Sequence, residues 1–104
     1  MEISLKELLE VANNNSSDLQ PYEIGKYYFI RTVTHYLTGR IVEVGTQEII
    51  LFDAAWIADT GRYADAIKTS EFNEVEPYPD QNVIVGRGTV IDAVRIDKLP
   101  RVQK

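Results

Sequence analysis

The sequence predicts a mainly β protein in which one N-terminal helix precedes five short strands. Aromatic and β-branched residues, which favour extended backbone, gather in short runs separated by Gly, Pro and Asn. The first residues instead show the spacing of an amphipathic helix. The most informative stretch is 83–96, VIVGRGTVIDAVRI, in which two apolar strands flank Gly86-Arg87-Gly88.

Length and composition limit the possible classes of protein. The chain has 104 residues, which suits a single domain over residues 1–104. With no cysteine and one histidine, neither disulfides nor a zinc site of the usual kinds are expected, so we predict no metal and no cofactor. No apolar run reaches membrane-spanning length and the N-terminus lacks a secretory signal pattern, so we expect a cytoplasmic protein.

The formal net charge of −5 disfavours non-specific binding to nucleic acid. The charge is unevenly distributed, however. Residues 59–80 contain six acidic and two basic side chains, whereas residues 81–104 contain two acidic and five basic ones. The segment around Arg87 is therefore basic, although a solvated surface with a slightly basic tail explains the same distribution.

A helix is predicted over residues 4–13. Ser4 and Glu7 fit a capping box, in which each side chain accepts a hydrogen bond from a main-chain N–H of the first turn. Apolar residues recur at i, i+3, i+4 and i+7 and give the helix one apolar face. That face consists of Leu5, Leu8, Leu9 and Ala12. The Asn and Ser residues at 13–17 end the helix.

Three strands are predicted next, over residues 26–33, 39–44 and 47–57, with a turn at 34–38 between the first two. The third of them is apolar on both faces apart from Asp53. A strand of this kind must be covered on both sides. In so small a domain we expect the N-terminal helix or a neighbouring subunit to cover the second face, which predicts assembly with copies of the same chain.

Residues 59–81 are predicted to form an acidic loop. Within it, residues 62–68 fit either an extended hairpin or one helical turn, and residues 71–80 contain four acids and two prolines. Strands over 83–86 and 89–96 follow. The tight turn between these strands is expected to need a positive φ at a glycine.

The sequence offers little for catalysis. His35 lies in a predicted turn, and no spacing places a nucleophile and an orienting acid beside it. Gly86-Arg87-Gly88 lacks the third glycine and the following helix of a dinucleotide-binding fingerprint. No phosphate-binding or calcium-binding loop pattern occurs. We therefore expect a protein that is not an enzyme.

Arg87, Gly88, Ile91 and Val94 form the pattern Arg-Gly-x-x-apolar-x-x-apolar, which resembles the second signature of Sm-like proteins. That family includes the Sm and LSm proteins and bacterial Hfq. The first signature is loosely met over residues 39–51, and the predicted order of helix and strands is similar as well. The chain looks most like the small, divergent Sm-like proteins of bacteriophages, cyanophage among them.

The resemblance implies a small, strongly bent five-stranded antiparallel barrel of the Sm-like/SH3-like type, assembled into a homo-oligomeric ring of roughly five to seven subunits. In the family, strand four of one subunit pairs with strand five of the next, and single-stranded RNA binds near the pore. The implied interface residues are Val83, Ile84, Val85, Val90, Ile91 and Val94. The implied RNA-binding residues are Thr46, Gln47, Arg87 and Gly88. Such a protein would act in the cytoplasm, which is the host cytoplasm if it is phage-encoded.

The loop after the second predicted strand departs from the family pattern. Gly45, Thr46, Gln47 and Glu48 stand where members with uridine sites carry Asp, an aromatic residue and Asn. The aromatic stacking partner is thus missing from this loop. Two functions remain open: an RNA-binding ring in RNA metabolism or regulation, or an oligomeric phage or bacterial protein that acts through protein contacts alone. The acidic segment 59–80 favours the second.

Overall fold

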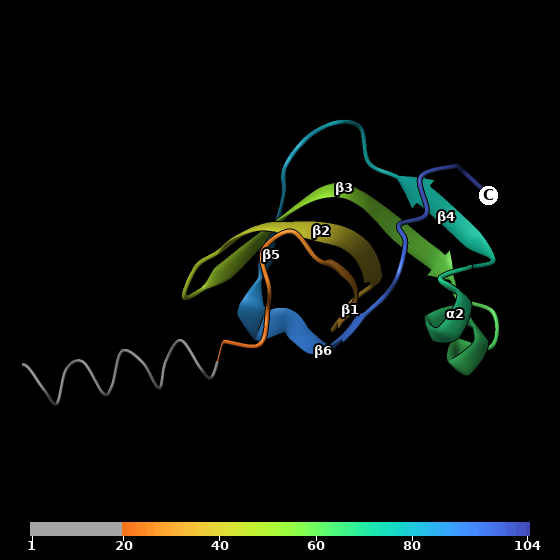
Figure 1. Cartoon of the computed structure of the whole chain (residues 1–104), viewed down its shortest axis with the longest axis horizontal. Coiled ribbons are helices and arrows are strands. Elements are labelled where there is room, and N and C mark those ends of the chain that lie inside the picture. Colours follow the sequence, from red (N-terminus) through yellow and green to blue (C-terminus); the bar gives the residue numbers. More distant parts are fainter. Residues whose placement is uncertain (1–19) are drawn as a thin grey trace, which may run out of the picture.

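A computed structural model describes residues 20–104, in which six strands form one sheet beside a single helix (Figure 1). The elements are β1 (Tyr27–Thr32), β2 (Tyr36–Val44), β3 (Glu48–Asp59), α2 (Tyr63–Thr69), β4 (Glu74–Pro77), β5 (Val83–Gly86), the 3-10 turn η1 (Arg87–Thr89) and β6 (Val90–Arg95). The mainly β prediction is confirmed, whereas the helix predicted at 4–13 lies outside the described residues. No helix within residues 20–104 is long and apolar enough to cross a membrane.

The sheet is antiparallel and open. Its strand order is β4-β3-β2-β1-β6, and β5 also pairs with β3. Because β3 has twelve residues, it accommodates two partners along one edge, β5 at residues 48–51 and β4 at residues 55–59. In the part of the chain that the structure describes, β5 and β6 do not pair with each other. The expected barrel is therefore not closed, and the sheet has six strands rather than five.

The extra strand and the helix both lie in residues 59–81, for which the sequence predicts an acidic loop. That prediction is wrong because Phe72 and Val75 are buried although acidic residues surround them in sequence. Val75 stands between the exposed Glu74 and Glu76, so β4 has the alternation of a half-buried strand. Of the two alternatives for residues 62–68, the helical one is observed, as α2.

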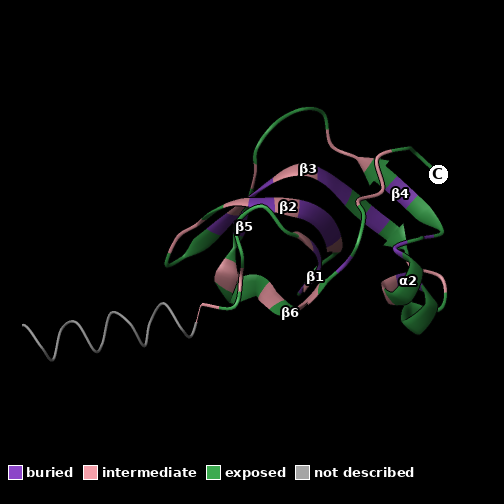
Figure 2. Ribbon diagram, in the orientation of Figure 1, coloured by how far each residue is buried: buried purple, intermediate pink, exposed green. Residues whose placement is uncertain are grey.

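β3 contributes to two cores on opposite faces of the sheet. Figure 2 shows buried stretches in both β2 and β3. The first core consists of Tyr28, Ile30, Leu37, Ile41, Ile49, Leu51, Ala54 and Val85. The second core consists of Phe29, Ala55, Ile57, Ala66, Phe72, Val75 and Ile96. Asp53 has a φ of 53° and lies at a bulge, where the pairing of β3 with β2 changes register. A bulge reverses the alternation of side chains, so β3 faces the first core before Asp53 and the second core after Ala54.

The second core is covered by α2 and by the chain that follows β6. The ring of Phe72 stacks on Phe29 with centroids 5.4 Å apart, and Ile96 and Leu99 lie alongside. Within residues 20–104 this face is thus covered by α2 and the chain after β6, whereas the N-terminal helix predicted to cover it lies outside the described residues. Burial of a side chain such as Phe72 contributes about 1.5–3 kcal/mol, so the acidic segment is an integral part of the fold.

Gly39 is the glycine that the sheet requires. β2 begins at Tyr36, so Gly39 lies inside this strand and not at its start, and residues 36–38 are not a turn. A β-carbon on Gly39 would lie 2.9 Å from the Cβ of Leu51, which is closer than carbon atoms approach without displacement.

The turn at 86–88 makes no comparable demand on glycine. Neither Gly86 nor Gly88 has a positive φ, since the chain passes through η1 with ordinary backbone angles. A β-carbon on Gly88 would meet nothing within 4 Å. The predicted positive φ in this turn is therefore wrong.

Candidate functional site

The β2–β3 loop and the turn between β5 and β6 form one corner of the molecule. The main-chain N–H of Arg87 donates to the carbonyl oxygen of Gln47 at 2.8 Å, and Arg87 Nη1 donates to the carbonyl oxygen of Gly45 at 2.7 Å. Thr46, Gln47 and Gly88 are exposed around these bonds. The fold thus brings together the four residues that the resemblance implies for RNA binding.

The guanidinium of Arg87 is held within its own chain. It lies over the ring of Tyr22, with its central carbon 5.4 Å from the ring centroid, and Nη2 donates to Gln20 Oε1 at 3.2 Å. Burial raises the pKa of Tyr22 above its usual value, against the opposing effect of the Arg87 charge. An aromatic ring therefore does contact this arginine, but it comes from the segment before β1. Nothing in the spacing of the sequence connects Tyr22 with residue 87.

A hollow of about 330 Å3 runs beside this arginine along β6. Its lining comprises Pro21, Tyr22, Tyr28, Arg87 and four successive residues of β6, Val90, Ile91, Asp92 and Ala93. Because successive residues of a strand point to opposite faces, a run of four neighbours in one lining means that the edge of β6 borders the hollow. Asp92 is paired there with Arg31, whose Nε donates to Asp92 Oδ1 at 2.8 Å. That bond holds the pKa of Asp92 below its usual value.

A second hollow, of about 250 Å3, runs along β5. All four residues of the strand line it, together with the turn at residues 32–35, Leu37, Tyr78 and Thr89. The edge of β5 therefore also borders open space. The outer edge of β4 is occupied, because Val75 and Lys104 exchange main-chain hydrogen bonds of 3.0 and 3.2 Å.

The six implied interface residues differ in exposure. Ile84 on β5 and Ile91 on β6 are 70% and 64% exposed and are among the large apolar side chains that this domain leaves in solvent. Val83, Val90 and Val94 are half-buried, and the side chain of Val85 belongs to the first core. Two large apolar side chains are thus available to a partner, one on each of the bordering strands.

Residues 20–104 contain no group of three His, Cys, Asp or Glu side chains arranged to hold a metal ion. His35 lies in the β1–β2 turn, where its Nδ1 is hydrogen bonded to Thr34 Oγ1 at 2.8 Å. Comparisons of the chain with protein-family models, with curated proteins and with solved structures found no match. The functional assignment therefore depends on the geometry of the strand edges and of the corner around Arg87.

Proposed function

We propose that the protein is a non-catalytic, Sm-like ring protein whose subunits join by strand addition and which binds single-stranded RNA at the corner around Arg87. The proposal rests on two strand edges that border open hollows, one on β5 and one on β6, which η1 connects. In the proposed barrel of the Sm-like/SH3-like type, these two stretches would correspond to the family's strands four and five.

The two edges favour a closed assembly. Among residues 20–104, β5 pairs with β3 on one side only, and β6 pairs with β1 on one side only. Pairing β5 of one subunit with β6 of the next is a head-to-tail contact, and such contacts close into rings when the rotation permits. Closure leaves no unpaired edge to promote aggregation. Covering Ile84 and Ile91 at each contact would contribute about 1–2 kcal/mol per side chain.

RNA binding is the second part of the proposal. A base would stack on the guanidinium of Arg87 opposite the ring of Tyr22 or in its place, and the exposed side chains of Thr46 and Gln47 stand beside it to contact base edges. A ring repeats this corner in every subunit, and repetition concentrates positive potential even though the subunit is acidic.

One observation favours the alternative of a ring that works through protein contacts alone. Arg87 already uses both terminal nitrogens within its own chain, on Gly45 and Gln20, so a nucleotide would have to add to these contacts or replace them. The acidic segment 59–80 points the same way.

Light scattering of the full chain at micromolar concentration tests the ring, and a titration with oligouridylate and oligoadenylate at two salt concentrations tests RNA binding. We expect a mass of roughly five to seven subunits and an affinity that falls as salt rises. A mass of one subunit would overturn the ring. A ring that binds neither RNA at low salt would leave the protein-contact function in its place.

A matched pair of variants tests the strand edges themselves. Ile84→Asp places a charge on the bordering edge of β5 and should reduce the mass to that of one subunit. Val102→Asp likewise replaces an exposed apolar side chain, 74% accessible, in the C-terminal segment that pairs with β4 through Lys104, and it should leave the mass unchanged. Equal masses for the two variants would contradict pairing through β5.

A further inference from the structure

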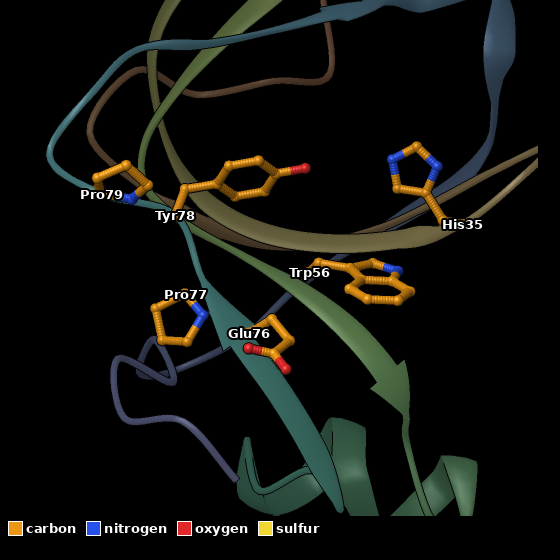
Figure 3. Close-up of a pocket in the computed structure, with 6 residues that line it drawn as sticks. All are labelled: His35, Trp56, Glu76, Pro77, Tyr78 and Pro79. Carbon is orange, nitrogen blue, oxygen red and sulfur yellow. The ribbon is translucent and has the colours of Figure 1, made fainter.

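A hollow of about 440 Å3, larger than the two described above, lies over the end of β3 and the segment that follows β4. It is lined by His35, Trp56, Glu76, Pro77, Tyr78 and Pro79. Figure 3 shows the ring of Tyr78 extending toward His35, with the indole of Trp56 near the gap between them and Glu76 beside it. Its volume is within the range of about 300–1,000 Å3 that is typical of ligand pockets.

Trp56 is exposed here as a result of the bulge in β3. Ala55 and Ile57 face the second core, so Trp56 points to the other face, beyond the last residue that reaches the first core. The indole remains 42% exposed, although tryptophan is among the most strongly buried residues on average. A half-exposed indole in an apolar hollow is typical of a binding surface.

The wall formed by Pro77, Tyr78 and Pro79 is rigid. Proline fixes the backbone angle φ at two of these three positions. The N–H of Tyr78 donates to the carbonyl oxygen of Ala54 at 2.9 Å, and Arg101 Nη2 donates to the carbonyl oxygen of Tyr78 at 3.0 Å. The hollow is therefore formed before any ligand arrives, which reduces the entropic cost of binding.

The lining combines aromatic rings, free donors and one carboxylate. No hydrogen bond within residues 20–104 engages the indole N–H of Trp56 or the hydroxyl of Tyr78, so both can donate to a ligand. The apolar rings of a polyproline II segment pack against aromatic side chains, and its carbonyl groups lack internal partners. The carboxylate of Glu76 would attract a cationic side chain next to that segment.

We infer that this hollow binds a proline-rich peptide segment that carries an arginine or lysine, a function separate from the ring and from RNA. Charge distinguishes this partner from a nucleic acid. Bases also stack on aromatic rings, but the carboxylate of Glu76 lines the hollow, and Asp80 follows its last lining residue, Pro79. Within residues 20–104 Glu76 forms no ion pair, whereas Asp80 lies 4.0 Å from Arg101. Phosphates would be repelled there, whereas a basic peptide would be attracted.

Trp56 is the one tryptophan of the chain, so its fluorescence reports directly on the hollow. The full chain is titrated with an acetylated peptide of one arginine followed by six prolines, and with a matched peptide in which glutamate replaces the arginine. We expect a saturable blue shift of the emission with the arginine peptide and at least fivefold weaker binding of the glutamate peptide. Tyr78→Ala should weaken binding of the arginine peptide at least fivefold.

Two substitutions separate the role of Glu76 from general electrostatics. Glu76→Gln should remove most of the preference for the arginine peptide, whereas Glu43→Gln, an exposed change on β2 outside this hollow, should preserve it. The proposal is overturned if neither peptide gives a saturable shift, or if both bind equally to the unmodified protein. A shift that only oligouridylate produces, or one that follows dilution without any peptide, would assign the hollow to RNA or to a second copy of the chain and would equally overturn it.

Discussion

Arg87 and Gly45 are joined by a hydrogen bond of 2.7 Å from the guanidinium Nη1 to the main-chain oxygen, which ties η1 to the β2–β3 loop. The same side chain contacts Gln20 and lies over Tyr22. Arg87 thus links three segments of the chain: η1, the β2–β3 loop and the segment before β1.

Replacing Arg87 should therefore affect stability as well as binding. Arg87→Ala removes two hydrogen bonds from a charged donor and one cation–π contact, and we expect a loss of about 1–3 kcal/mol in the free energy of unfolding. Arg87→Lys keeps the charge but not the forked geometry, so it should recover only part of that loss. Urea denaturation followed by circular dichroism measures both. A change of no more than a few tenths for Arg87→Ala would mean that these links are unimportant.

RNA affinity gives an independent measure of the same residue. If a base stacks on the guanidinium, Arg87→Ala should weaken binding of oligouridylate at least tenfold, since one such contact is worth about 1–3 kcal/mol. Lys26→Ala removes an equal charge from an exposed position and serves as the control. Equal losses in the two variants would indicate general electrostatic attraction and not a site at Arg87.

Two glycines should respond in opposite ways to the same substitution. Gly39→Ala places a β-carbon against Leu51 and should destabilise the fold by about 1–3 kcal/mol, as overpacked interiors do. Gly88→Ala places one in open space at an ordinary φ and should change stability by less than about 0.5 kcal/mol. Thermal and urea unfolding of both variants check this order, and the reverse order would show that the turn at 86–88 is the strained one.

Phe72 should be among the most sensitive positions of the acidic segment. It is 2% exposed and stacks on Phe29, so Phe72→Ala should cost about 3–5 kcal/mol through lost burial and the cavity left behind. Phe52→Ala, at a half-buried ring beside Arg40, should cost clearly less. Similar, small costs for both would contradict the assignment of Phe72 to the second core.

Asp92 should contribute to stability in a way that depends on pH. The hydrogen bond from Arg31 lowers the pKa of Asp92 in the folded protein. A lowered carboxyl pKa stabilises the fold above the unfolded value of about 3.9, and this contribution is lost as the pH falls through the folded value. The free energy of unfolding of Asp92→Asn should therefore fall less steeply toward acid than that of the parent protein.

The bond from Lys98 lowers the pKa of Glu71 as well, so the parent protein alone does not isolate Asp92 in this acidic window. The measured quantity is the difference between the acid slopes of Asp92→Asn and the parent. Asp97→Asn, at an exposed side chain on the following segment, provides the control and should retain the parental slope. An unchanged slope for Asp92→Asn would show that the pair with Arg31 contributes nothing to acid stability.

Local sequence predicted the strands that carry continuous apolar runs and failed where apolar residues are sparse. β1, β3, β5 and β6 overlap the ranges predicted from their aromatic and β-branched content. Phe72 and Val75 escaped prediction because their acidic neighbours lower the local hydrophobicity, although each is buried by partners distant in sequence. The start of β2 was mispredicted at Gly39. A glycine at the start of a strand and a glycine inside a strand that leaves room for a neighbouring side chain cannot be told apart in sequence.

The candidate site was likewise predicted in part from the sequence. Thr46, Gln47, Arg87 and Gly88 meet at one corner, as the resemblance implies. Tyr22 joins them from the segment before β1, and local spacing carries no information on contacts between residues so far apart. The hollow around Trp56 depends on the bulge at Asp53, since a regular strand would have placed the indole on the other face.

The bulge at Asp53 also affects how the protein unfolds. β3 is a single strand shared by two cores, so disrupting either core removes support from the backbone that the other requires. If each core had its own strand, the two cores would behave as independent folding units. Because both cores share β3, they are coupled through this one strand. Hydrogen exchange should accordingly show the slowest amides of both halves of β3 opening together, in one cooperative event, at the global free energy of unfolding.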